Sequence, residues 1–198
     1  MKLNWAERLV VNNPGRVFEQ RAEIRWLQRR LPLKPGALVL EVGCGRGAGA
    51  GLILKEFEPA AIYAMDLDVE MIKRAEKYLS SSQKECIFMQ TADVAQLPYR
   101  DEVFDAVFGF GVLHHVPDWR RGLAELARVL KTGGHYYMEE LYPALYQNFI
   151  TRHILLHPEE NRFTSSDLKG ILNTVHLSIT EAFECKAIGI LATLVKTG

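Results

Sequence analysis

Val39-Leu40-Glu41-Val42-Gly43-Cys44-Gly45-Arg46-Gly47 is the stretch that decides the fold of this chain. Its apolar start predicts a buried strand, and its glycines predict a tight turn whose backbone adopts positive φ and comes close to a ligand. The helix expected after the turn offers free N–H groups at its start. Glu41 favours a ligand that carries a cation, since a phosphate would be repelled by the carboxylate. We therefore expect a small polar ligand at this turn.

Composition narrows the class of protein. The chain has 198 residues, of which 48% are hydrophobic, so we predict one domain spanning 1–198. Lys plus Arg number 24 and Asp plus Glu number 24, which leaves no overall field to attract nucleic acid or an anionic membrane. The start lacks the apolar core of a signal peptide, and no window approaches the roughly 18 apolar residues of a membrane span. We expect a cytoplasmic protein with no nucleic-acid partner and no integral membrane segment; the oligomeric state stays open.

The cysteines predict neither a disulfide framework nor a metal site. Cys44, Cys86 and Cys185 are an odd number, lie far apart and form no Cys-x-x-Cys pair. We expect ordinary thiols in a reducing compartment and no bound metal.

Apolar runs alternate with helical patterns from residue 37 onward. Strands are predicted at 37–42, 60–65, 86–90, 103–108 and 135–138, at the spacing of βα units. Helices are predicted after the caps Asp68 and Asp118, the second running over 119–130 and ended by a turn at 131–134. The pattern predicts an α/β fold with a doubly wound sheet and helices on both faces. Two further helices, at 5–11 and 16–31, are predicted ahead of the sheet and hinged at 12–15.

Two more carboxylates follow predicted strands. Asp66 ends the second strand about 20 residues past the glycine turn, where doubly wound folds place an acid that hydrogen-bonds the ribose hydroxyls of a nucleoside. Asp93 follows the third strand, where it would accept from an adenine amino group while Val94 packs on the ring. Each Asp is also an ordinary cap or turn residue. Their shared spacing favours the nucleoside interpretation.

A dinucleotide site is the chief alternative. Gly43-x-Gly45-x-x-Ala48 also satisfies the glycine-alanine form of the nicotinamide-binding fingerprint. Glu41 would face a pyrophosphate, however, and 198 residues leave no room for a second nucleotide-binding half. An NAD-dependent oxidoreductase is therefore the less favoured hypothesis, and a non-catalytic or regulatory cofactor-binding protein is another.

Five ordered motifs resemble the class I S-adenosylmethionine-dependent methyltransferases, in particular the small-molecule branch of the ubiquinone and menaquinone biosynthesis enzymes. They are Leu40-Glu41-Val42-Gly43-Cys44-Gly45-Arg46-Gly47, Ala64-Met65-Asp66-Leu67-Asp68, Ala92-Asp93 with Leu97-Pro98, Phe104-Asp105-Ala106-Val107 with Leu113-His114-His115-Val116, and Leu130-Lys131-Thr132-Gly133-Gly134.

The resemblance implies a Rossmann-like seven-stranded sheet whose last strand, at 189–196, is antiparallel. It implies S-adenosyl-L-methionine as cofactor and a domain with N-terminal helices covering the site (1–35), a cofactor-binding core (36–140), a lid or acceptor region (141–175) and a C-terminal hairpin (176–198). The cofactor-binding residues that it implies are Glu41, Gly43, Cys44, Gly45, Asp66, Leu67, Asp93, Val94 and Phe110.

The acceptor is less defined. Gly109-Phe110-Gly111-Val112 stands where methyltransferases of nucleobase or glutamine amines often carry an Asn/Asp-Pro-Pro-Tyr/Phe run, so we expect a small-molecule acceptor. His114 and His115 are the candidate catalytic bases. Glu139 and Glu140 end the fifth strand at the same edge of the sheet. The sequence places no carboxylate clearly beside either histidine, so alignment of the acceptor with the methyl group is expected to suffice.

Patterns after the fifth strand and at the N-terminus suggest further hypotheses about the acceptor, a metal and the cofactor. Apolar residues recur at helical spacing and predict either a lid helix or plain core packing, which modestly favours an apolar or aromatic acceptor. They are Tyr142, Leu145, Tyr146, Phe149 and Ile150. His153 and His157, four residues apart, lack a third metal ligand. Arg16 is either a contact of the cofactor's carboxylate or a solvated side chain.

Overall fold

Seven strands form one mixed sheet in the computed structural model, which describes residues 14–146 and 161–198. The spatial order is β3-β2-β1-β4-β5-β7-β6. The strands are β1 (Leu38–Val42), β2 (Ala61–Asp66), β3 (Ile87–Thr91), β4 (Phe104–Phe110), β5 (Leu130–Leu141), β6 (Leu177–Cys185) and β7 (Gly189–Lys196). All pairs from β3 to β5 are parallel, and β7 is antiparallel to both of its neighbours. The predicted seven-stranded sheet with an antiparallel last strand is confirmed.

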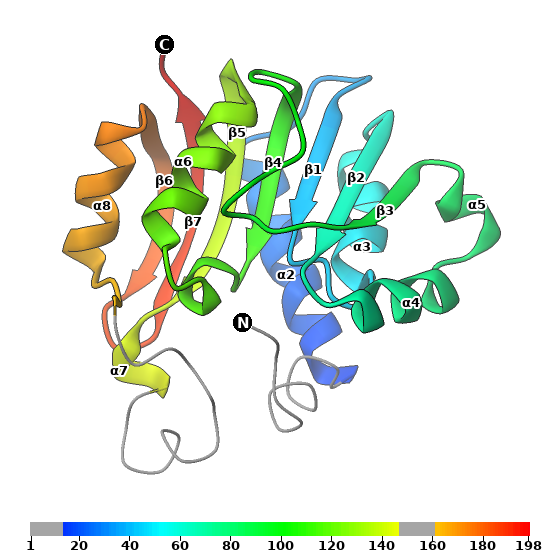
Figure 1. Cartoon of the computed structure of the whole chain (residues 1–198), viewed down its shortest axis with the longest axis horizontal. Helices are drawn as coiled ribbons and strands as arrows, with labels where there is room; N and C mark the ends of the chain where they lie inside the picture. Colours follow the sequence, from blue (N-terminus) through cyan, green and yellow to red (C-terminus); the bar gives the residue numbers. More distant parts are fainter. Residues whose placement is uncertain (1–13, 147–160) are drawn as a thin grey trace.

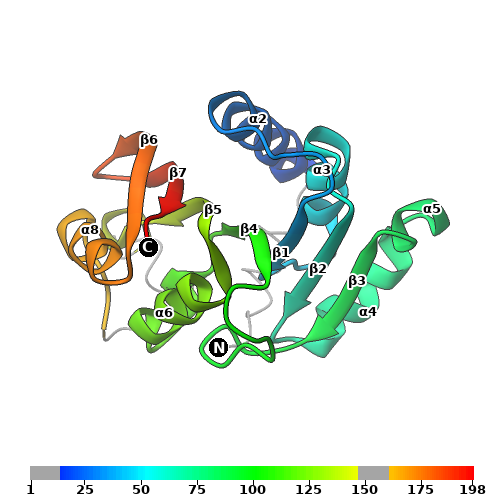
Figure 2. The same ribbon diagram turned by 90° about the horizontal axis from the view of Figure 1, so that it is seen from above.

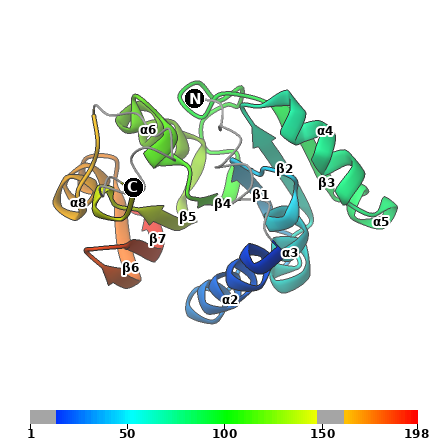
Figure 3. The same cartoon turned by 90° about the horizontal axis from the view of Figure 1, so that it is seen from below.

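Helices cover both faces of this sheet (Figures 2 and 3). On one face lie α2 (Pro14–Arg30) and α3 (Ala48–Phe57), and on the other lie α6 (Trp119–Val129) and α8 (Ser165–Thr174). The helices α4 (Val69–Tyr78) and α5 (Ser81–Lys84) contact β3. Two short turns, η1 (Leu113–His115) and α7 (Pro143–Tyr146), follow β4 and β5. The predicted helix at 5–11 lies outside the described residues.

Local signals account for the helix ends. Asp68 accepts from the backbone N–H of Glu70 at the start of α4, and Asp118 accepts from that of Arg121 at the start of α6, as the predicted caps require. The turn predicted at 131–134 is wrong, because these residues belong to β5. Leu130 already pairs with Phe104, and the register shifts before Ala106 pairs with His135, so the extra residues form an irregular stretch inside the strand.

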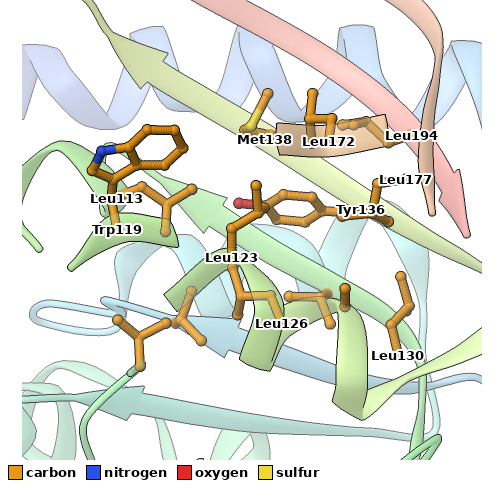
Figure 4. Close-up of a cluster of buried hydrophobic side chains, with 14 of the residues drawn as sticks. Leu113, Trp119, Leu123, Leu126, Leu130, Tyr136, Met138, Leu172, Leu177 and Leu194 are labelled. Carbon is orange, nitrogen blue, oxygen red and sulfur yellow. The ribbon is translucent and has the colours of Figure 1, made fainter. Parts of the chain in front are cut away.

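A core on each face fixes the sheet. On the α6 face, Trp119 and Tyr136 are fully buried among leucines from α6, α8, β6 and β7 (Figure 4). On the α2 face, the rings of Phe108 and Tyr137 stack at 4.3 Å between centroids, with Ile24 of α2 fully buried nearby. Each large apolar side chain buried in this way contributes about 1.5–3 kcal/mol. The carboxyl ends of β1, β2 and β4 are therefore held together at one edge, the lower edge in Figure 1.

Candidate cofactor-binding site

The glycine turn after β1 has the backbone that the sequence predicts. Gly43, Gly45 and Gly47 adopt φ of 66°, 53° and 83°. The N–H of Cys44 donates to the carbonyl of Met65 at 2.9 Å, which ties the turn to the end of β2. A Cβ placed on Gly43 would stand 2.5 Å from a methyl group of Val112, whereas one placed on Gly45 would meet nothing within 4 Å. The turn therefore leaves open space at Gly45.

That space belongs to a cavity of about 220 Å³ at the carboxyl edge of the sheet. The turns after β1, β2, β3 and β4 all contribute to its wall. Among the predicted site residues, the following line it: Gly43, Gly45, Asp66, Leu67, Asp93, Val94, Phe110 and His115. Glu41, Cys44 and His114 do not line it. The wall also contains residues that the sequence does not single out as a site: Met65, Asp68, Met71, Ala92, Ala95, Gly111, Val112, Val116, Pro117 and Asp118.

Asp66 joins two of these turns. Its Oδ2 accepts from the N–H of Gly45 at 2.9 Å, and its Oδ1 accepts from the N–H of Asp68 at 2.8 Å. Burial raises the pKa of the Asp66 carboxyl, against the effect of these N–H groups, which lower it. Each carboxylate oxygen retains a lone pair for a further donor, so Asp66 can accept from a hydroxyl in the cavity.

Asp93 combines two roles that the sequence left as alternatives. Its Oδ1 accepts from the N–H of Ala95 at 2.9 Å, which makes it a turn residue. It is also exposed and lines the cavity, and the neighbouring Val94 is buried with only 7% of its surface accessible. A polar and an apolar surface therefore stand side by side at this end of the cavity.

Glu41 lies behind the glycine turn. It is buried against the start of α3, where a Cβ on Gly49 would collide with its Oε1. Its Oε2 has no hydrogen-bond partner among the described residues. Burial raises the pKa of Glu41 to about 8, the nearby charge of Asp66 adds to the effect, and the N–H of Ala50 opposes it. Burial also raises the pKa of the Cys44 thiol, which is therefore protonated at neutral pH.

His114 is part of a buried polar network at the end of β5. Its Nδ1 lies 2.8 Å from Oε2 of Glu140, whose side chain is completely buried. Glu140 also accepts from the backbone N–H groups of Val112, Leu113 and His114 at 3.2, 2.8 and 3.2 Å. One carboxylate thus holds both the start of η1 and the ring of His114.

The network continues into the elements that flank residues 147–160. The ring of Tyr146 stacks on His114 at 5.7 Å between centroids, and Arg162 donates to the carbonyl of His114 at 2.6 Å. His115, beside His114 at 4.3 Å between ring centroids, is the histidine that lines the cavity. Tyr142 and Tyr146 of the predicted apolar stripe are buried, while Phe149 and Ile150 lie outside the described residues.

Sequence reasoning missed the Glu140–His114 pair because the two residues are 26 positions apart. A signal was present in the alternation of β5, since Tyr136, Met138 and Glu140 share the face that packs against α6. A carboxylate on a buried apolar face requires a polar partner.

Arg16 does not line the cavity. Its guanidinium donates to Glu139 at 2.6 Å and to Glu23 at 2.8 Å, so α2 is joined to the end of β5. Burial raises the pKa of Glu139 to about 7, although the charge of Arg16 acts in the opposite direction. Neither Glu139 nor Glu140 lines the cavity, and both have protein partners.

Metal ligands and membrane spans are absent from the part of the chain that the structure describes. No group of three or more His, Cys, Asp or Glu side chains there could hold a metal ion. His153 and His157 lie outside the described residues. No helix in the described part of the chain is long and apolar enough to cross a membrane.

Residues 40–138 match the methyltransferase domain family, and the chain belongs to this family. The matched range runs from β1 through most of β5 and includes every turn that lines the cavity. The family confirms the assignment to the class I S-adenosylmethionine-dependent methyltransferases, whose cofactor is S-adenosylmethionine.

Particular relatives are similar over about half of the chain. A phthiotriol/phenolphthiotriol dimycocerosates methyltransferase of Mycobacterium tuberculosis is 36% identical over 108 residues, which are 54% of this chain and 39% of the relative. A fatty-acid O-methyltransferase of Mycolicibacterium smegmatis is also 36% identical over 108 residues, 54% of this chain and 38% of the relative. The similarity therefore spans about two fifths of the length of these curated relatives.

A solved structure matches the fold over nearly its whole length. The S-adenosylmethionine-dependent methyltransferase from Aquifex aeolicus superposes with a TM-score of 0.77, over 99% of this chain and 100% of that one. The two sequences are 18% identical, so this likeness shows the fold.

Proposed function

We propose that the protein transfers the methyl group of S-adenosylmethionine to a small apolar or aromatic acceptor by in-line displacement at the sulfonium methyl group. One observation carries the proposal: Gly45, Asp66, Asp93 and His115 line the same cavity. Candidate cofactor ligands and a candidate base therefore face one space of limited size.

The residues present fit this cofactor. The space at Gly45 is open, as a close approach between ligand and backbone requires. Asp66 would hold the ribose hydroxyls, Asp93 and Val94 would contact the adenine, and Phe110 would border the methyl group. The glycine turn would pack on the methionine part.

Glu41 contributes to the preference of the site for a cationic ligand. Its Oε2 is buried without a partner among the described residues, and it lies behind the glycine turn. The raised pKa keeps Glu41 mostly protonated at neutral pH in the unbound protein, but a cation bound at the glycine turn would favour its ionised form and a pyrophosphate would disfavour it, which supports S-adenosylmethionine over NAD.

S-adenosylmethionine supplies a methyl group that is already electrophilic because it is bonded to a sulfonium. The protein therefore has to align the acceptor and exclude water. Apolar side chains on the cavity wall, Val94, Phe110, Val112 and Val116, would exclude water. The rigid network under η1 would fix the part of the wall that faces the acceptor.

His115 is the candidate to take a proton from an acceptor hydroxyl, because it lines the cavity. His114, held by Glu140, would position its neighbour. We expect His115→Ala to change kcat only slightly, because alignment dominates. A fall in kcat of about 10² or more with unchanged cofactor affinity, together with an acid limb near pH 6–7, would assign His115 as a general base.

Two observations support the acceptor class: the apolar side chains on part of the cavity wall, and the names of the relatives, which refer to dimycocerosates and fatty acids. The test uses methyl-labelled S-adenosylmethionine with total metabolite extract, and with Asp66→Ala as the control enzyme. Label in hydroxylated lipids or phenolic compounds supports the proposal. Label confined to nucleic acid or protein contradicts the acceptor class, and cofactor binding without any labelled product contradicts methyl transfer.

A further inference from the structure

One side of α2 gathers arginine and aromatic side chains. Seven residues recur at spacings of three and four, so they share one face of the helix. They are Phe18, Arg21, Ala22, Arg25, Trp26, Arg29 and Arg30, and we call them the arginine stripe; together they line a surface hollow of about 660 Å³. Ile24 and Leu27, on the inner side of the helix, are fully buried. α2 is the outermost layer on its face of the sheet (Figures 2 and 3), and five of the seven stripe residues are exposed, while Arg21 and Trp26 are half-buried.

The stripe is a local concentration of positive charge. Four of its seven residues are arginine and none is acidic. Glu56 of α3 pairs with Arg21 at 3.5 Å and with Arg25 at 3.1 Å. Arg29 and Arg30 form no ion pair with the described residues. A chain with equal numbers of acidic and basic residues thus carries a cationic face.

Aromatic rings lie among these charges. Phe18 is 76% exposed, the most exposed of the large hydrophobic side chains described. The guanidinium of Arg30 lies 5.3 Å from the ring centre of Trp26. Trp26 is half-buried and packs against the core, so Phe18 is the exposed ring of the stripe. An exposed ring beside arginines is typical of helices that lie at a lipid interface, where the ring enters the apolar boundary and the guanidinium contacts lipid phosphates.

The stripe also begins near the edge of the sheet where the cavity opens. Phe18 closely follows Arg16 in α2, and Arg16 contacts Glu139 at the carboxyl end of β5. A surface that contacts Phe18 therefore lies on the same side of the molecule as the ends of the parallel strands.

We propose that the arginine stripe docks α2 on the surface of an anionic lipid membrane. A second copy of the chain does not fit, because two such faces would place arginines opposite arginines. Nucleic acid also offers phosphates to the arginines, but it lacks the apolar boundary region that a lipid surface offers to the exposed ring of Phe18. A lipid surface needs only local contact within a Debye length, about 10 Å at 0.1 M salt, and it accepts the exposed ring of Phe18.

The test is co-sedimentation of the full chain with vesicles, without any methyl donor, so that its outcome is independent of the proposed methyl transfer. We expect binding to mixed phosphatidylglycerol and phosphatidylcholine vesicles, weak binding to phosphatidylcholine alone, and release in about 1 M salt, where the Debye length is about 3 Å. The double variant Arg29→Glu/Arg30→Glu should lower the partition at least tenfold, since each basic residue near an anionic surface contributes about 1 kcal/mol.

Two matched controls isolate the stripe. Lys77→Glu/Lys84→Glu makes the same change in net charge, also in the last turns of helices, but on α4 and α5. Phe183→Ala on β6 removes a ring that is 70% exposed, to compare with Phe18→Ala. The controls should bind as the parent does, and Phe18→Ala should bind several-fold less.

Three results would overturn the proposal. These are no preference for anionic vesicles, equal losses in the stripe variants and the controls, or stripe-dependent binding of duplex DNA or single-stranded RNA with none of vesicles. Circular dichroism of each variant establishes that it is folded.

Discussion

The turns after β1 and β2 and the segment after β4 lie at the same edge of one sheet, but they use their polar groups differently. In the first region, Asp66 and the turn at Gly45 line an open cavity. In the second, Glu140 is completely buried and His114 nearly so, and each has the other as a partner. The polar groups of the first region can form hydrogen bonds with a ligand. Those of the second region form hydrogen bonds with the protein's own backbone.

This difference shows how the carboxyl edge of the sheet can hold an open cavity and still have a rigid backbone. A carboxylate that accepts from three backbone N–H groups and lies 2.8 Å from a ring nitrogen of His114 fixes the path of η1. That path carries Val112 and His115 on the cavity wall. We therefore expect substitutions in the first region to affect ligand binding, and substitutions of Glu140 to affect stability.

The largest effect is expected for Glu140→Ala. The variant leaves buried N–H groups of residues 112–114 and the ring of His114 without their acceptor, so the free energy of unfolding should fall by about 3–5 kcal/mol. Urea denaturation measures the change. Glu181→Ala, at an exposed position of β6, should stay within about 0.5 kcal/mol. A loss below about 1 kcal/mol for Glu140→Ala would mean that the network does not hold η1.

Gly45→Val should remove cofactor binding. Gly45 and Gly36 both have positive φ, 53° and 80°, and a Cβ added to either glycine would have no other atom within 4 Å. Only Gly45 lines the cavity. Both valine variants should lose similar stability because of backbone strain, while calorimetric titration should detect binding by Gly36→Val alone. Equal binding by the two variants would remove Gly45 from the site.

Asp66→Ala should weaken cofactor binding by about 1.5–3 kcal/mol, the contribution of hydrogen bonds to a charged acceptor. Asp105→Ala is its control, because Asp105 also accepts from a backbone N–H, that of Leu38, but at the opposite end of β1. The two variants should lose comparable stability. Unchanged affinity in Asp66→Ala would show that the ribose is held elsewhere.

The smallest effect concerns pH. Burial raises the pKa of Glu41 to about 8 from 4.5, so its contribution to stability is complete below about pH 4.5 and is lost as the pH rises through about 8. Glu41→Gln removes this titration. The stability of the parent protein relative to the variant should therefore fall by about 1 kcal/mol or more between about pH 5 and 8. A difference that is constant over this range would contradict the burial of an ionisable Glu41.

The two regions also differ in how far sequence predicts them. The glycine turn, Asp66 and Asp93 follow predicted strands directly, and parallel strands bring their carboxyl ends to one edge, so local motifs are enough to place these residues together. The fold follows from the same alternation of strands and helices. The family resemblance supplies the number of strands and the direction of the last one.

Long-range polar contacts are not predictable in the same way. Glu140 reaches His114 across 26 positions, and Arg16 reaches Glu139 across 123, separations at which no local pattern specifies a partner. The extension of β5 back to Leu130 depends on pairing with Phe104 rather than on the glycines at 133 and 134. The net charge of the chain likewise does not predict the arginine stripe, because the sum of all charges does not say which face of the protein each residue occupies.

Calorimetric titration of the protein with S-adenosylmethionine, S-adenosylhomocysteine and NAD tests most directly that the cavity is an S-adenosylmethionine site. Micromolar binding of the first two ligands and no measurable binding of NAD are expected, because the carboxylates of Asp66 and Asp93 on the cavity wall suit a cationic nucleoside and oppose a pyrophosphate. Comparable affinity for NAD, or no binding of either adenosyl ligand, would contradict it.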